Sequence, residues 1–272
     1  MIKRVFALIF PALLALSLAW PAAGQESISL VGSTSLLPLS QHLAEAYMLR
    51  HPQVRVSVAG RGSGVGVRAI IDGTADIAGV SRELSAREID LCEKRGVKPV
   101  AHLAALGCVV PVVDRANPVA GLSREQLKDV YAGKINSWRA LGGPARPIAV
   151  MNRDTNSGSM VLFRLLVMGG GRVRRDALML ASNGAMVQAV AGNPLALGYV
   201  GLGYLEPRLK PLAINGVAAS LATVRSGAYP LSRHLYLLTG GRPQGRVKEF
   251  LDFMAGPQGQ EIVRRQGLIP VR

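Results

Sequence analysis

Small hydroxyl residues and glycines gather at four places where an apolar run gives way to a helical pattern. These stretches are residues 32–35, 60–64, 79–82 and 152–159, and three of them carry an arginine: Arg61, Arg82 and Arg153. A dehydrated oxyanion needs hydrogen-bond donors, and hydroxyls, free amides at a helix start and guanidinium groups all supply them. The pattern therefore predicts an anion-binding site.

Apolar runs alternate with helical patterns along the chain, which is typical of an α/β protein. The pattern predicts strands at 28–31, 54–58, 76–80, 109–113, 148–151, 196–201 and 235–238, and helices at 85–95, 124–131, 159–168, 247–254 and 258–266. Ser85 and Glu88 have the spacing of a capping box at the start of one helix. Ligands of open α/β sheets bind at the carboxyl ends of strands. Three donor stretches come from the first third of the chain and one from the middle, so we expect the anion to lie in a cleft between two lobes.

The first residues have the pattern of an export signal. Lys3 and Arg4 precede an apolar segment, and small residues end at Gly24. We therefore expect residues 1–24 to be a cleaved signal peptide and the protein to be periplasmic or extracellular. The formal net charge is +15 and aromatic residues make up 5% of the chain. Because of the expected export, and because the aromatic residues do not interleave with the basic ones, we expect no nucleic-acid partner.

The cysteines and histidines do not suggest a metal site or a cofactor. Cys92 and Cys108 are the only cysteines. In an oxidising compartment they could form one disulfide, or Cys108 could be a core residue, and the sequence leaves both possibilities open. The four histidines are scattered, so no metal site is expected. The glycine pattern at 64–69 lacks the acidic residue of a dinucleotide site, so no cofactor is expected.

The hydroxyl residues do not have the surroundings of a catalytic nucleophile. A nucleophile elbow needs a glycine two residues before and two residues after the serine. Ser63 has Arg61 and Val65 at these positions, and Ser157 has Thr155 and Ser159. We therefore expect a protein that is not an enzyme. Asp154 follows Arg153 at a predicted loop tip, where its carboxylate could orient the guanidinium or accept a proton from a protonated ligand.

Eleven stretches, in this order, resemble the phosphate-binding periplasmic receptors of ATP-driven phosphate importers. The resemblance covers nearly the whole chain after residue 24. The stretches are 32–35, 62–64, 73–77, 81–82, 127–135, 136–138, 153–154, 157–159, 197–200, 229–233 and 267–270.

The resemblance implies a type II periplasmic-binding-protein fold, in which two α/β lobes joined by crossing strands close on the ligand. Lobe I would comprise residues 25–107 and 202–272, and lobe II residues 108–201. The partners would be inorganic phosphate and the membrane permease of a phosphate importer, and the receptor would be a monomer. Carried over position by position, the phosphate-binding residues would be Thr34, Ser35, Leu36, Ser63, Gly64, Ser81, Arg82, Arg153, Asp154, Ser157, Gly158 and Ser159.

The sequence departs from the pattern of the family in three ways. Ser159 replaces the usual threonine and keeps its hydroxyl, and His234 stands where a proline is usual. The third departure concerns selectivity. Some members have aspartates in the binding loops that accept a proton from hydrogen phosphate, and Ser81 and Thr155 stand at those positions here. Asp154 is the nearest carboxylate that could replace them, and we expect it to maintain a preference for phosphate. The alternatives are a receptor for another tetrahedral oxyanion, such as sulfate or molybdate, and an exported phosphatase-like hydrolase.

Overall fold

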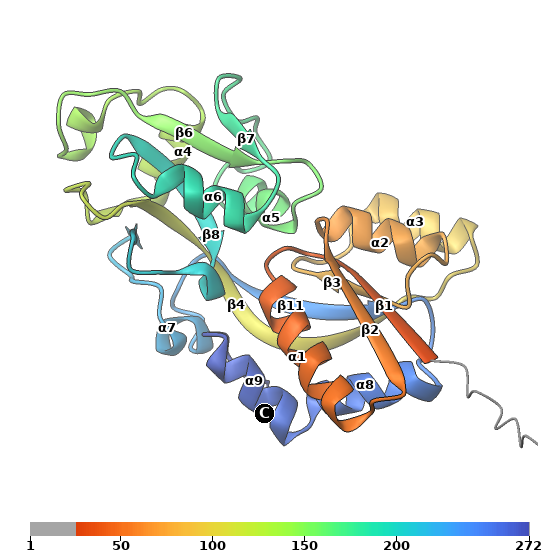
Figure 1. The fold of residues 1–272 in the computed structure, drawn as a ribbon. Helices are drawn as coiled ribbons and strands as arrows, with labels where there is room; N and C mark the ends of the chain where they lie inside the picture. The colour runs from red at the N-terminus through yellow and green to blue at the C-terminus, as the bar shows by residue number, and fades with distance from the viewer. Residues whose placement is uncertain (1–25, 272) are drawn as a thin grey trace, which may run out of the picture.

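The computed structural model describes residues 26–271, which form two α/β lobes that share one long sheet (Figure 1). The predicted signal peptide at 1–24 lies outside the described residues. Along the sheet the strands follow the order β2 (Val54–Gly60), β1 (Glu26–Gly32), β3 (Ile77–Val80), β11 (Ser232–Thr239), β4 (Val100–Asp114), β8 (Ala196–Gly201), β6 (Ala149–Arg153) and β7 (Leu178–Leu180). The strands predicted from the sequence are all present, which confirms the α/β fold class.

Strand β4 connects the two lobes. It is 15 residues long, and it pairs with β11 as far as Cys108 and with β8 from Val109 onward. The change of partner falls between Cys108 and Val109, one residue beyond the predicted boundary between residues 107 and 108. Figure 1 shows β4 running from one lobe into the other.

The return from lobe II to lobe I is less abrupt than the predicted boundary at residue 202. Strand β9 (Leu209–Pro211) pairs with the far end of β4, and β10 (Ala213–Ile214) pairs with β5 (Gly121–Leu122). Residues 209–214, which the sequence assigned to lobe I, thus pair with strands of lobe II. The chain rejoins lobe I after α7 (Leu221–Arg225), when it enters β11.

Helices cover both faces of the lobe I sheet (Figure 1). On one face α1 (Leu37–Arg50) contacts α8 (Gly245–Ala255) and α9 (Pro257–Arg265). On the other face α2 (Ser63–Ile71) packs beside α3 (Ala86–Lys94). Because side chains alternate across a strand, neighbouring residues of β3 enter different cores: Ile77 joins the first cluster and Ala78 the second.

Lobe II contains α4 (Arg124–Tyr131), α5 (Gly158–Leu166) and α6 (Asn183–Val190), together with the short 3-10 helices Trp138–Leu141 and Leu202–Tyr204. Several helices begin with a serine cap. Ser85 and Ser123 form capping boxes with Glu88 and Gln126, which confirms the box predicted at Ser85. The sequence patterns did not predict β7 and α6.

The two cysteines lie in separate parts of the core. Cys92 belongs to the cluster around α2 and α3, whereas Cys108 lies in the main core at the middle of β4. Both are buried free thiols. The structure therefore favours the second of the two possibilities that the sequence left open, in which Cys108 is a core residue.

Within residues 26–271, no helix combines the length and the apolar character that a membrane span requires. The same residues contain no group of three or more His, Cys, Asp or Glu side chains placed to hold a metal ion.

Candidate anion site between the two lobes

Three loops of lobe I bring their hydroxyl groups together. Strands β1, β2 and β3 are parallel, and Gly32 is in register with both Gly60 and Gly79, so the loops after these strands leave from one edge of the sheet. Gly32 has φ of 151°, and a Cβ at this position would lie 2.2 Å from the Gly79 oxygen. Only glycine therefore permits the chain to leave β1 this close to β3.

The serines at this edge form a buried chain of hydrogen bonds. The Ser33 hydroxyl donates to Ser81 Oγ at 2.9 Å, and Ser63 Oγ lies 3.2 Å from Ser81 Oγ. Ser63 and Ser81 are fully buried. The sequence separations are 48 and 18 residues, so only the sheet topology explains this cluster.

Lobe II contributes the start of helix α5. Ser157 is the N-cap residue and its hydroxyl accepts a hydrogen bond from the Met160 amide at 3.2 Å. A Cβ on Gly158 would lie 2.5 Å from both Ser63 Oγ and Ser81 Oγ. The positive end of the α5 dipole therefore faces the serine cluster of lobe I directly.

Arg153 ends strand β6 and points into the same region. Its Nε donates to the Leu180 oxygen at 3.0 Å, and its Nη2 donates to the Ala181 oxygen at 3.0 Å and to Thr34 Oγ1 at 3.2 Å. Its Nη1 is buried without a hydrogen-bond partner among the described residues. Burial lowers the pKa of Arg153, although the nearby Tyr199 and Asp154 oppose the effect. One guanidinium nitrogen is thus left free for a ligand.

A second buried arginine, Arg233, completes the site from strand β11. Its Nη2 donates to Ser35 Oγ and its Nη1 to Ser159 Oγ, each at 2.9 Å, while Nη1 also reaches the Ser81 oxygen at 3.3 Å. Its Nε is buried without a partner in the part of the chain described. Burial lowers the pKa of Arg233 to about 10, and the positive charge of Arg153 acts in the same direction.

Residues 229–233 resemble a signature stretch of the family, but their sequence predicted no role for Arg233 in the site. An arginine at the second position of a strand is unremarkable unless its neighbours in space are known. The available signal was weak: no Asp or Glu lies between Glu206 and Glu249, so Arg233 has no carboxylate nearby in the sequence.

Asn183, the first residue of α6, was also missed. Its Nδ2 donates to Thr34 Oγ1 at 3.0 Å and to Ser35 Oγ at 3.1 Å, while its Oδ1 accepts from the Gly201 amide at 3.0 Å. Tyr204 donates from its hydroxyl to the Thr34 oxygen at 2.8 Å. These contacts hold the hydroxyls of lobe I against lobe II.

Other residues predicted for the site have side chains that bond elsewhere. Arg82 makes a bidentate pair with Glu88, with two N–O distances of 2.7 Å. The Asp154 carboxylate accepts a hydrogen bond from the Asn156 amide at 2.8 Å within its own loop. Gly64 donates from its amide to the Asn156 oxygen at 3.1 Å and so joins the lobes through the backbone. Leu36 is buried beside the loop.

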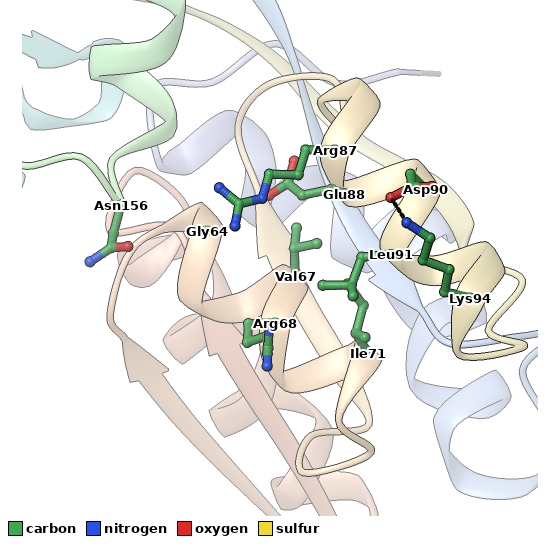
Figure 2. A pocket seen from close by; sticks show the side chains of 10 residues that line it. All are labelled: Gly64, Val67, Arg68, Ile71, Arg87, Glu88, Asp90, Leu91, Lys94 and Asn156. Atoms are coloured by element: carbon green, nitrogen blue, oxygen red, sulfur yellow. Dashed lines mark hydrogen bonds and ion pairs between the residues drawn. The ribbon is translucent and has the colours of Figure 1, made fainter.

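A cavity of about 480 Å³ lies near this junction but is chemically different. Figure 2 shows it between α2 and α3, with Asn156 of lobe II across from Gly64. Its charged side chains are mostly paired: Lys94 bonds to Asp90 at 2.8 Å and Arg68 to Asp72 at 2.7 Å. Two buried donors without a partner in the described chain, Arg153 Nη1 and Arg233 Nε, lie instead at the serine and arginine cluster between the lobes.

Comparison with known proteins identifies the family. A family model described as a PBP superfamily domain matches residues 19–258. The phosphate-binding protein PstS of Bacillus subtilis (strain 168) is 30% identical over 259 residues, covering 92% of this chain and 84% of that protein. The chain belongs to the family of phosphate-binding proteins. PstS of Borreliella burgdorferi is 29% identical over 285 aligned positions that span 99% of both chains.

Solved structures agree with this assignment. A phosphate ABC transporter substrate-binding protein from Clostridium perfringens, with bound phosphate, superposes with a TM-score of 0.84 at 30% identity, over 91% of this chain and all (100%) of that chain. An ABC-type phosphate transport receptor from Vibrio cholerae gives a TM-score of 0.73 at 31% identity, over 89% and 99% of the two chains. The two lobes and the shared strand thus form the type II periplasmic-binding-protein fold that the resemblance implied.

Proposed function

We propose that the protein captures inorganic phosphate outside the cytoplasm and delivers it to the membrane permease of an ATP-driven importer. One observation carries the proposal: two buried guanidinium groups from different lobes donate to neighbouring hydroxyls, and neither has a carboxylate partner among residues 26–271. Arg153 donates to Thr34, and Arg233 donates to Ser35 and Ser159. A buried cation without a counter-ion is costly, and an oxyanion between the lobes relieves that cost.

The family supports phosphate as the anion, since the relatives in Bacillus subtilis and Borreliella burgdorferi are both named phosphate-binding protein. The phosphate-binding residues would be Thr34, Ser35, Ser63, Ser81, Arg153, Gly158 and Ser159, as the sequence predicted, with Arg233 and Asn183 in addition. Arg82 and Asp154 would act indirectly, by fixing the loops that carry Ser81 and Arg153.

The protein would work as a monomeric periplasmic or extracellular receptor without catalytic activity. The loops of the two lobes meet at the ligand, so binding and lobe closure would be coupled, and the permease would recognise the closed form. Sulfate or molybdate is the second candidate ligand, because the cluster between the lobes consists of donors and hydroxyls.

Calorimetric titration of the mature protein with phosphate, sulfate, arsenate and molybdate tests the proposal. Saturable binding of phosphate at one site per chain is the expected result. Binding of sulfate or molybdate in the absence of any phosphate binding would instead assign the protein to the second candidate ligand.

A further inference from the structure

We infer that this site takes the dianionic form of a tetrahedral oxyanion and recognises it by charge, with Arg233 and Arg153 as the two counter-charges. The inference rests on the proposed function and deepens it, because it specifies which protonation state of phosphate binds. It also implies that sulfate, which is a tetrahedral dianion, should bind to this site.

The charge balance around the two arginines is the first step. The side chains of Arg153 and Arg233 are 1% and 7% exposed, and neither forms an ion pair within residues 26–271. Arg82 provides the contrast, since its buried guanidinium has Glu88 as a counter-ion at 2.7 Å. The fold therefore neutralises one arginine of these loops internally and leaves two positive charges for the ligand.

Apart from Asp154, the other titratable groups around the pair do not supply negative charge. Burial raises the pKa of Tyr199, and it raises the pKa of Tyr204 and of Cys108 to about 12, so all three are neutral at physiological pH. Asp154 is the one carboxylate beside Arg153, and its bonded oxygen is turned to the Asn156 amide of its own loop. That Asp154 accepts a ligand proton stays a prediction from the sequence.

A dianion matches the two unpaired charges, whereas a monoanion leaves one buried guanidinium uncompensated. Because an uncompensated charge in a desolvated site is strongly unfavourable, the affinity should follow the fraction of ligand that carries two charges. Arg153 Nη1 and Arg233 Nε are buried without partners in the described chain and remain available to it. Arg82 Nε is also without a partner there, but Glu88 neutralises the charge of that guanidinium.

Selection against sulfate requires a fixed acceptor for the ligand proton, either a carboxylate or a carbonyl oxygen. The carbonyl oxygens of Leu180, Ala181 and Ser81 at this site already accept hydrogen bonds from the two arginines. Sulfate lacks a proton, so a carboxylate in contact with it would repel it, while hydrogen phosphate could donate to the same group. The groups that meet here are serine and threonine hydroxyls, which can donate or accept by rotating. These hydroxyls carry no formal negative charge with which to reject sulfate.

The experiment is calorimetric titration of the mature protein with phosphate and with sulfate on both sides of the second ionisation of phosphate, at about pH 5.5 and about pH 8.5. We expect the Kd for phosphate to rise at least roughly tenfold at the lower pH, because most of the ligand is then monoanionic. Sulfate stays dianionic, so its Kd should change less than about threefold and should lie within roughly tenfold of that for phosphate at the higher pH.

The outcomes separate the two proposals. Equal phosphate affinity at both pH values, or no detectable binding of sulfate, would overturn the dianion inference while leaving the phosphate receptor intact. Sulfate binding with no phosphate binding at either pH would overturn both the proposed function and the dianion inference, because phosphate is also a dianion at the higher pH. Failure of both anions to bind would overturn both.

Two substitutions at Arg233 test whether this residue sets the preferred charge of the ligand. Arg233→Gln keeps a hydrogen-bond donor but removes one charge, so it should weaken phosphate binding more at the higher pH than at the lower and flatten the pH dependence. Arg233→Lys keeps the charge and should keep the dependence, even if binding is weaker. Arg265→Gln, on an exposed arginine of α9 paired with Glu261, is the matched control and should behave as the native protein. Identical pH dependence in all three variants would show that Arg233 does not set the preferred charge.

Discussion

Replacement of Arg153 by alanine gives the sharpest test of the anion site. The native side chain is 1% exposed, contacts both lobes through Thr34, Leu180 and Ala181, and keeps Nη1 free for the ligand. Hydrogen bonds from a buried guanidinium to an oxyanion contribute about 2–5 kcal/mol, because the anion keeps its desolvation cost when the partner is lost. The Kd for phosphate should therefore rise roughly 30-fold to 5,000-fold.

Arg153→Ala should affect the ligand-free protein much less. The substitution removes a buried charge that has no carboxylate partner in the described chain, which is favourable, but it leaves the carbonyl oxygens of Leu180 and Ala181 without their donor. Because these effects oppose each other, we expect a small change in the Tm of the free protein and a large loss of the rise in Tm that phosphate produces.

Calorimetry and thermal unfolding with and without phosphate measure both effects. Arg265→Ala is the control, since this side chain is 75% exposed and pairs with Glu261 at 3.2 Å. If both variants lost the same affinity, general positive charge would hold the anion and not the geometry of the loop. An unchanged Kd in Arg153→Ala would remove Arg153 from the site altogether.

Three further substitutions test separate parts of the argument. Gly158→Ala places a methyl group 2.5 Å from the Ser63 hydroxyl. Phosphate affinity measured by calorimetry should therefore fall at least roughly tenfold, and the free energy of unfolding should fall by about 1–3 kcal/mol. If the variant bound phosphate as tightly as the native protein, the close approach of α5 to Ser63 would be contradicted. Asp154→Asn keeps the loop bond to the Asn156 amide, so the ratio of phosphate to sulfate affinity in competition titrations should change less than about threefold; a larger rise in sulfate affinity would restore Asp154 as the selecting group. Burial opposes ionisation of Glu88, but hydrogen bonds from Arg82 and Ser85 outweigh it and hold its pKa below the ordinary value. Glu88→Gln should therefore cost about 1–2 kcal/mol in urea unfolding at neutral pH, and this difference should disappear as the pH falls through the folded-state pKa of Glu88; a difference that persists in acid would mean that the charge of Glu88 is not what stabilises the fold.

The elements of the fold that sequence reasoning predicted are those with strong local patterns. Valines alternate in β2, and a serine cap with a glutamate three residues later marks the start of α3. In β7 the exposed Leu178 and Met179 give no alternation, and α6 is only eight residues long, so its buried apolar face is limited to Met186, Val187 and Val190. These two elements depend on tertiary contacts and could not be read locally.

The same distinction applies to the site. Loops after parallel strands must meet at one edge of a sheet, so the serines of lobe I and Arg153 could be proposed from their positions alone. Arg233 lies on an antiparallel strand that returns from the far end of the chain, and only the three-dimensional pairing of β11 with β3 and β4 brings it to the anion. Arg82 looked equivalent to Arg153 in sequence, yet Glu88 lies six residues away and pairs with it.

The position of β11 has a consequence for the order in which the protein acquires its structure. This strand lies between β3 and β4 in the sheet but is made after the whole of lobe II, so during synthesis the lobe I sheet has a missing strand and two unpaired edges. Pairing across such a long sequence separation is slow, and open edges invite association with other chains. Strand β11 also carries Arg233. A chain whose lobe I sheet still lacks β11 therefore also lacks the second positive charge of the anion site. Binding of the anion would therefore mark the end of folding and stabilise only chains that have reached it.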